Sequence, residues 1–137
     1  HLKGKIDARI NNDLLIEMDE LKTIISKGKN YILIDSRSPE RYKGLIEPYD
    51  KIPGRIPTSI NIFFKDVMNE NRIKEIEDLK KVYNNIDSDK MVIAYCGSGV
   101  TAPINIVAMD EVGLYSRLYL GSYSDYVSYK DNVIEKD

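Results

Sequence analysis

Short apolar runs alternate along this chain with stretches whose apolar residues recur at helical spacing. Apolar runs bounded by Gly, Pro, Asn or Asp predict buried strands, and apolar residues three or four positions apart predict amphipathic helices. The predicted strands are Tyr31–Ile34, Ile60–Phe63, Met91–Tyr95 and Leu114–Leu120. The predicted helices are Asp19–Lys27, a short one starting at Ser38-Pro39, Ile73–Tyr83, Ala102–Val112, and a short one within Gly121–Tyr129. Strands that alternate with helices predict an α/β fold, with a central parallel sheet covered by helices on both faces.

The segments between these elements suggest an extension followed by one domain. The polar, irregular residues 1–17 are predicted to be an N-terminal extension or a linker from a preceding segment, and residues 18–137 a single domain. Gly44–Pro57 carries two glycines and three prolines, so it is predicted to be a long loop. Ligands of a parallel sheet bind at the carboxyl ends of its strands, where Asp35 and Cys96 follow two of the predicted strands.

Composition excludes several classes of partner. The 20 Lys and Arg residues balance 22 Asp and Glu residues and form no basic cluster, so no nucleic-acid partner is expected. No apolar run exceeds six residues and no apolar signal segment follows the N-terminus, so no membrane association is expected. A single cysteine forms no internal disulfide, which favours a reducing, cytoplasmic location. The abundance of Ile, Lys and Asn is typical of a low-GC bacterial genome.

The sole cysteine lies in the segment Met91–Ala102, which reads M-V-I-A-Y-C-G-S-G-V-T-A. A predicted strand delivers Cys96 into a loop with Gly97 and Gly99, and a predicted helix follows. The backbone N–H groups of such a turn, together with the positive end of the helix dipole, favour the thiolate over the thiol. Cys96 is therefore predicted to be a nucleophile. The alternative is a small buried apolar residue, which is a common role of free cysteines.

Histidine is nearly absent, because the only one is His1. Cysteine proteases and acyltransferases need an imidazole base beside the thiol, and zinc sites need clustered Cys and His ligands, so these classes are excluded. No metal and no organic cofactor is expected. Cysteine phosphatases place an arginine six positions after the cysteine, where this chain has Ala102, so phosphoester hydrolysis is disfavoured as well.

Four segments, taken in order, resemble the rhodanese family of sulfurtransferases. The C-G-S-G-V-T-A loop is similar to the active loop of 3-mercaptopyruvate sulfurtransferases, and Ile34–Gly44 resembles the family's D-x-R…R-(F/Y)-x-G segment. Gly54–Asn61 resembles G-H-I-P-G-A-x-N, and Leu118–Tyr126 resembles L-Y-D-G-S-W-S-E-W. The long loop, with its Glu47-Pro48 pair, resembles the C-terminal, catalytic half of tandem members.

The resemblance implies a rhodanese-like fold whose active-site loop joins a central strand to the following helix. It implies that Cys96 accepts a sulfane sulfur from 3-mercaptopyruvate, or from thiosulfate, as a persulfide. A thiol, cyanide or a thioredoxin-like protein would then accept the sulfur. The resemblance further implies a second rhodanese domain in the full-length protein. The alternative function is a non-catalytic or partner-dependent persulfide carrier, or a regulatory rhodanese module.

The resemblance also assigns roles within the Cys96 loop. Cys96 and Ser98 are expected to be catalytic, with the Ser98 hydroxyl donating to sulfur or to the leaving group. Backbone N–H groups are expected to stabilise the thiolate and the terminal sulfur of the persulfide. The Thr101 hydroxyl is a further expected donor, with capping of the following helix as the alternative. The expected substrate-binding residues of the loop are Gly97, Gly99, Val100 and Thr101.

Three residues outside this loop are assigned by the same resemblance. Arg41 is expected to bind the carboxylate of the donor, with a surface ion pair to Glu40 or Glu47 as the alternative. Asp35 and Arg37 are expected to be structural and to hold neighbouring loops by buried hydrogen bonds.

The chain departs from the family pattern in and around the long loop. Arg55 replaces the usual histidine, and Thr58 replaces the usual glycine. A second substrate-binding arginine expected in Gly44–Gly54 is missing, and Lys51 or Arg55 are the candidates to replace it. These changes bear on the identity of the donor more than on the fold.

Overall fold

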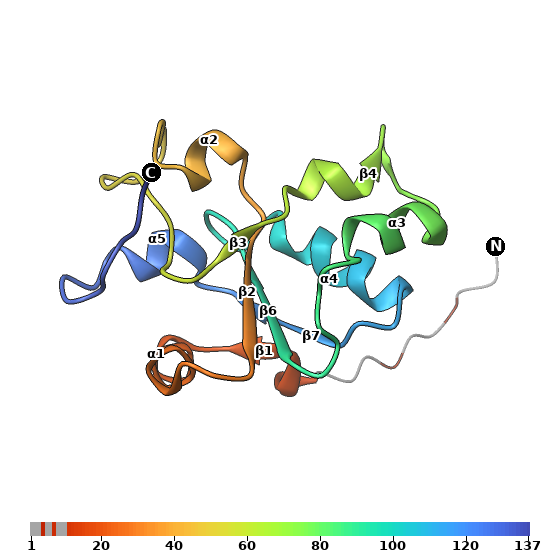
Figure 1. Ribbon diagram of the computed structural model, residues 1–137, viewed down its shortest axis with the longest axis horizontal. Helices are drawn as coiled ribbons and strands as arrows, with labels where there is room; N and C mark the ends of the chain where they lie inside the picture. Colours follow the sequence, from red (N-terminus) through yellow and green to blue (C-terminus); the bar gives the residue numbers. More distant parts are fainter. Residues whose placement is uncertain (1–3, 5–6, 8–10) are drawn as a thin grey trace.

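A five-stranded parallel sheet forms the centre of the computed structural model (Figure 1). The structure describes Gly4, Asp7 and residues 11–137. Every pair of neighbouring strands in the sheet is parallel, which confirms the predicted α/β class. In spatial order the strands are β1 (Leu15–Ile16), β7 (Ser116–Tyr119), β6 (Met91–Tyr95), β2 (Tyr31–Asp35) and β3 (Ile60–Asn61).

The longest strand pair brings together the two segments that carry the candidate site. β2 and β6 pair over their whole length, from Tyr31 opposite Met91 to Asp35 opposite Tyr95. Both strands are apolar apart from Asp35, as is typical of strands that are covered on both faces. Their carboxyl ends therefore meet at one edge of the sheet, and Cys96 leaves β6 beside the chain that follows Asp35.

Helices cover both faces of the sheet (Figure 1). Along β6, Val92 and Ala94 face one apolar cluster while Ile93 and Tyr95 face the other, because successive side chains of a strand point to opposite sides. The cluster around Ile93 is closed by α1 (Met18–Lys27) and α5 (Ser122–Tyr126). The cluster around Val92 is closed by the 3₁₀ helix η2 (Phe64–Val67), α3 (Ile76–Val82) and α4 (Ala102–Glu111).

The helix predicted over Ile73–Tyr83 is wrong at its start. Ile73 pairs with Met68 in an antiparallel hairpin of β4 (Met68–Asn69) and β5 (Arg72–Ile73), and α3 begins only at Ile76. Glu70, in the tight turn between these strands, has a φ of 54°. Ile73 lies three positions before Ile76, which is the spacing of apolar residues in a helix. The pattern of apolar residues therefore could not distinguish a strand followed by a helix from one longer helix.

A second difference lies in the segment predicted to be an extension. Leu15 and Ile16 form β1, an edge strand that pairs with β7, and Ile16 is 1% exposed in the core. A strand of two residues has no periodicity to detect, and the 3₁₀ helix η1 (Asn12–Leu14) precedes it. The rest of the predicted extension includes residues 1–3, 5, 6 and 8–10, which lie outside the described residues.

The other predicted helices and strands are present, but two strands are shorter than predicted: the one expected over Ile60–Phe63 ends at Asn61, and the one expected over Leu114–Leu120 is Ser116–Tyr119. The short helix after β2 is α2 (Pro39–Tyr42), and Pro39 occupies its first turn, where a missing N–H costs no hydrogen bond.

Thr58 has a φ of 67°, a conformation that suits the glycine of the family pattern, and its hydroxyl lies 2.7 Å from that of Tyr31. No helix within the described ranges has the length and apolar character needed to cross a bilayer.

The loop over Gly44–Pro57 is fixed by contacts that come from distant parts of the chain. Tyr95 is buried, and its hydroxyl accepts a hydrogen bond from the Ile56 N–H at 3.2 Å. The backbone of Arg55 pairs with that of Glu135, near the end of the described chain. The loop is therefore held over the same edge of the sheet at which β2 and β6 end.

Candidate active site

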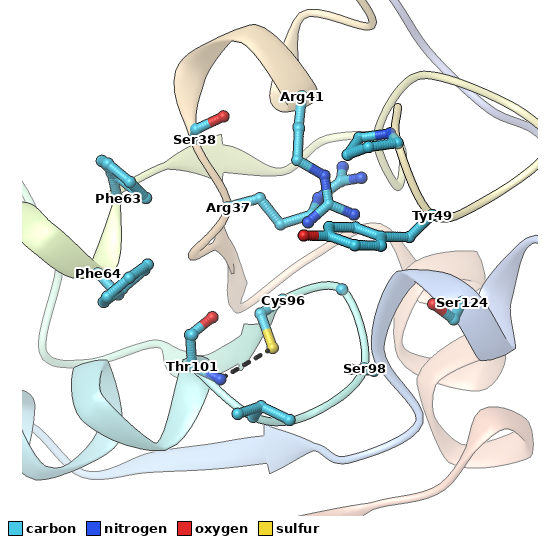
Figure 2. Close-up of a pocket in the computed structure, with 13 residues that line it drawn as sticks. Arg37, Ser38, Arg41, Tyr49, Phe63, Phe64, Cys96, Ser98, Thr101 and Ser124 are labelled. Carbon is cyan, nitrogen blue, oxygen red and sulfur yellow. Dashed lines mark hydrogen bonds between the residues drawn. The ribbon is translucent and has the colours of Figure 1, made fainter. Parts of the chain in front are cut away.

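Cys96 lies at the carboxyl end of β6, in the loop that leads into α4, and is 1% exposed. The N–H of Thr101, at the far end of this loop, donates to the Cys96 Sγ at 3.4 Å (Figure 2). A sulfur that accepts a backbone N–H at the start of a helix is in an environment that favours the thiolate. The structure thus has the strand, loop and helix arrangement that was predicted around Cys96.

Ser122, in α5, contacts Cys96 from a second element and is not among the predicted site residues. Its Oγ accepts a hydrogen bond from the Cys96 N–H at 3.1 Å and lies 3.8 Å from the Cys96 Sγ. The Ser122 hydroxyl also donates to the carbonyl of Tyr119 at 3.0 Å. Its φ of 58° is uncommon for serine, so tertiary contacts must hold it there. In the sequence, only the Leu118–Tyr126 motif pointed to this residue.

Opposing effects set the pKa of the Cys96 thiol. Burial raises this pKa, because desolvation disfavours the charged form. Hydrogen bonds from the Thr101 hydroxyl and from the N–H groups of Ala102 and Thr101 lower it. The hydrogen bonds outweigh burial, and the pKa of Cys96 lies below its ordinary value. The thiolate is therefore more populated at neutral pH than in an ordinary cysteine.

Gly99 determines the course of the loop around the sulfur. Its φ is 80°, and a Cβ at this position would lie 2.5 Å from the carbonyl oxygen of Leu120. Only glycine combines this conformation with so close an approach to another backbone. The loop is also tied to α5, since the carbonyls of Cys96 and Gly97 accept the N–H groups of Tyr123 and Ser124 at 3.0 and 2.9 Å.

Arg37 forms a buried ion pair at the end of β2. Its guanidinium donates to both carboxylate oxygens of Asp35 at 2.7 to 3.1 Å, to Glu47 at 3.1 Å and to the Gly54 carbonyl at 2.6 Å. The ring of Tyr123 lies 3.9 Å from its Cζ. The side chains of Arg37 and Asp35 are 1% and 0% exposed. These contacts join β2, the long loop and α5.

Arg41, in α2, is connected to the same ion pair through Glu47. Its guanidinium donates to the two Glu47 oxygens at 2.7 and 3.2 Å and lies 3.9 Å from Asp50. It also lies over the Cys96 loop, because a Cβ on Gly97 would be 3.2 Å from both of its terminal nitrogens. Arg41 is thus beside the cysteine, as donor binding requires. It also forms the ion pair named as its alternative, with Glu47.

A pocket of about 530 Å³ opens above Cys96 (Figure 2). This volume is typical of sites for small organic molecules. The rings of Tyr49, Phe63 and Phe64 form part of its wall, and none of them was predicted, since they lie outside the recognised motif positions. The pocket is lined by Arg37, Ser38, Arg41, Pro48, Tyr49, Phe63, Phe64, Cys96, Gly97, Ser98, Val100, Thr101 and Ser124.

Most of the predicted site residues line this pocket, and two do not. Asp35 is linked to it through Arg37, and Gly99 faces Leu120 instead. Ser98 is exposed, and its hydroxyl makes no hydrogen bond to the part of the chain that the structure describes. Val100 is 73% exposed at the pocket.

Neither candidate for the missing second arginine lines the pocket. Arg55 donates to Asp137 at 2.8 Å and lies 4.6 Å from the ring of Tyr42, while Lys51 is absent from the lining. Among the described residues, Arg37 and Arg41 are therefore the pocket's only cationic side chains. Within the same residues, no group of three or more His, Cys, Asp or Glu side chains is arranged to hold a metal ion.

The fold and the cysteine loop define an α/β domain with a cysteine between its central strand and the next helix. Residues 17–129 match the family model of the rhodanese-like domain, and the chain belongs to the rhodanese family. It is 31% identical over 130 residues to a Pseudomonas aeruginosa protein named a probable 3-mercaptopyruvate sulfurtransferase. It is 34% identical over 99 residues to a Mycobacterium tuberculosis protein provisionally named a thiosulfate sulfurtransferase.

The solved structure of Tum1 from Saccharomyces cerevisiae has the same fold, with a TM-score of 0.80 at 25% identity. The match covers 91% of this chain and 47% of Tum1. The matches to the Pseudomonas and Mycobacterium proteins cover 91% and 70% of this chain, but 45% and 35% of those proteins. The chain thus spans about half the length of such relatives, or less.

We expect Asp35→Ala to destabilise the fold by about 3–5 kcal/mol, because it leaves the Arg37 charge buried without its main partner. The free energy of unfolding can be measured by urea denaturation. Asp78→Ala is the control, since it breaks only an exposed pair with Lys81 and should change stability little. Equal losses in the two variants would contradict a structural role of the buried pair.

We expect Thr101→Val to raise the pKa of Cys96, because it removes a hydroxyl that stabilises the thiolate while keeping the side-chain shape. The rate of Cys96 alkylation by iodoacetamide, followed against pH, reports this pKa as its inflection. The wild-type inflection should lie below that of an ordinary thiol, and the variant's should lie higher. Thr23→Val, in α1, is the control. An unchanged inflection in Thr101→Val would show that the hydroxyl does not act on the sulfur.

Proposed function

We propose that this domain is a sulfurtransferase in which Cys96 carries sulfur as a persulfide. The proposal rests on the position of Cys96, which lines a pocket of small-molecule size. The pKa of its thiol is lowered at this position. Membership of the rhodanese family supports the same class of reaction, as do relatives named as sulfurtransferases.

In the first step, the Cys96 thiolate attacks the thiol sulfur of 3-mercaptopyruvate. A bond forms between Sγ and this sulfur while the donor's carbon–sulfur bond breaks, and its electron pair stays on carbon. That carbon takes up the proton from the donor's thiol, so the products are pyruvate and the Cys96 persulfide anion. With thiosulfate as donor, the sulfur–sulfur bond breaks instead and sulfite leaves with the electron pair.

In the second step, an acceptor attacks the outer sulfur of the persulfide and the Cys96 thiolate leaves. A thiol acceptor, including a thioredoxin-like protein, becomes a persulfide, and cyanide becomes thiocyanate. The cysteine returns to its starting state, so the cycle needs no metal and no organic cofactor. The N–H groups that stabilise the thiolate in the resting site stabilise it again as the leaving group.

The loop and Arg41 have separate roles in this scheme. We assign donor binding to the backbone from Gly97 to Thr101, including Gly99 and Val100, of which Thr101 donates directly to the sulfur. We assign the exposed Ser98 hydroxyl to the leaving group, since it makes no hydrogen bond within the described ranges. Arg41, which lies over Gly97, would bind the donor's carboxylate. This division favours 3-mercaptopyruvate, whose only full charge is remote from the reacting sulfur.

The proposal extends to the full-length protein and to its location in the cell. Because the chain matches about half of its relatives' length, we propose that the full-length protein contains a second rhodanese domain. The single cysteine must stay reduced to act, which favours the cytoplasm as the location, and the abundance of Ile, Lys and Asn favours a bacterial source.

A persulfide carrier that works with a protein partner is the second candidate. Tyr49 and Val100, which line the pocket, are 82% and 73% exposed, and apolar groups of this kind suit contact with another protein. Such a carrier would accept sulfur on Cys96 and then turn over slowly with small acceptors.

Incubation with 3-mercaptopyruvate should add one sulfur atom to the wild-type chain and none to Cys96→Ser, as measured by intact-protein mass spectrometry. The chain has no other cysteine, so the mass change reports this site alone. Dithiothreitol should remove the added sulfur as sulfide. Equal uptake by Cys96→Ser, or no uptake by the wild type from either donor, would contradict the proposed function. Ready uptake with slow transfer to small thiols would favour the carrier.

A further inference from the structure

The two arginines of the pocket are already neutralised by carboxylates. Arg37 is paired with Asp35 and Glu47, and Arg41 with Glu47 at 2.7 Å and Asp50 at 3.9 Å, so two guanidinium groups face three carboxylates. Partial burial raises the pKa of Glu47, but the hydrogen bond from Arg41 and the backbone N–H groups that follow Glu47 lower it below its ordinary value. Glu47 is therefore ionised at neutral pH, and the carboxyl groups of the cluster outnumber its guanidinium groups by one.

This charge balance affects anionic donors unequally. The other described residues that line the pocket carry no positive charge. Thiosulfate is a compact dianion, and binding it here would set two negative charges against an arginine that Glu47 and Asp50 already share. 3-Mercaptopyruvate carries one negative charge, on a planar carboxylate next to a planar ketone. Its binding needs hydrogen-bond donors more than additional positive charge.

Tyr49 is a pocket residue that can supply such a donor beside Arg41. Its ring lies 5.0 Å from the Cζ of Arg41, and Figure 2 shows the side chain reaching across the arginines with its hydroxyl in the pocket. The N–H of Tyr49 donates to the Glu47 carboxylate at 3.1 Å, and Pro48 restricts the backbone just before it. The side chain is 82% exposed, and these contacts hold the backbone from which it extends to Arg41.

We propose that Tyr49 determines donor specificity, favouring a planar monoanionic thiol such as 3-mercaptopyruvate over the dianion thiosulfate. The inference rests on the proposed sulfurtransferase function and names a residue that selects its substrate. The Tyr49 hydroxyl donates to the carboxylate or ketone oxygen of the donor, while the ring covers one face of the Arg41 guanidinium. The ring reduces the access of water to that ion pair, and losing water costs a dianion more than a monoanion, because the solvation of an ion rises with the square of its charge.

The alternative to this proposal is that Tyr49 is only an exposed residue of the long loop, with no effect on the choice of donor. Two variants distinguish these possibilities. Tyr49→Phe keeps the ring and removes the hydroxyl. Tyr49→Arg places a second cation beside Arg41. Neither should perturb folding, because the side chain is largely exposed. Tyr115→Phe is the matched control, since Tyr115 is 62% exposed and immediately precedes β7, at the opposite end of the strands from Cys96.

The experiment measures kcat and KM of persulfide formation with each donor, at constant ionic strength. For Tyr49→Phe we expect KM for 3-mercaptopyruvate to rise about fivefold, with little change for thiosulfate, as fits the loss of one hydrogen bond. For Tyr49→Arg we expect the kcat/KM ratio of thiosulfate to 3-mercaptopyruvate to rise about fivefold or more. Tyr115→Phe should match the wild type for both donors.

The outcomes separate the inference from the function on which it rests. A wild type that takes up sulfur while both Tyr49 variants keep its donor ratio within twofold would overturn the role of Tyr49 and leave the sulfurtransferase intact. A wild type that takes up sulfur from neither donor would overturn the proposed function, and the specificity inference with it. A wild type that prefers thiosulfate would contradict the inference directly.

Discussion

The buried ion pair between Asp35 and Arg37, extended through Glu47 to Arg41, is the constraint on which the candidate site depends. Charged groups of this kind are costly to bury unless each one is paired, and Asp35 and Arg37 are almost completely covered. Because Glu47 bonds both arginines, the long loop cannot move away from β2 and α2 without leaving a buried charge unpaired. The network therefore fixes one side of the pocket.

The opposite side of the pocket is fixed by hydrogen bonds to the cysteine loop. Burial by itself would hold Cys96 as a neutral thiol, and the donors around it reverse that effect. Thr101 approaches from the start of α4, whereas Ser122 approaches from α5, so the sulfur is held between two helices that pack on opposite faces of the sheet. A reactive thiolate can be kept here without histidine because backbone and hydroxyl donors do the stabilising.

The two sides of the pocket differ in the charged groups that they present. The cysteine loop supplies donors and no cation, while the arginine side supplies cations that carboxylates have already compensated. The resulting site is a largely apolar pocket with an aromatic wall, whose two arginines are already paired with carboxylates. A ligand in such a pocket is recognised mainly through hydrogen bonds and ring contacts. These contacts select among ligands by their shape and by the number of charges they carry.

The sequence by itself determined the strands β2 and β6, the helix after Cys96 and the cysteine loop, because each has a local signal. Apolar runs, helical spacing and the glycines around Cys96 act within about ten residues of the chain, and the motifs then identified the family. Tertiary structure alone decided that Ser122 contacts Cys96 from 26 positions away and that Glu47 occupies Arg41. It also decided that Tyr49, Phe63 and Phe64 wall the pocket, and that Ile73 joins a hairpin. These outcomes depend on which distant segments the parallel sheet brings together, and no local pattern of polar and apolar residues encodes that.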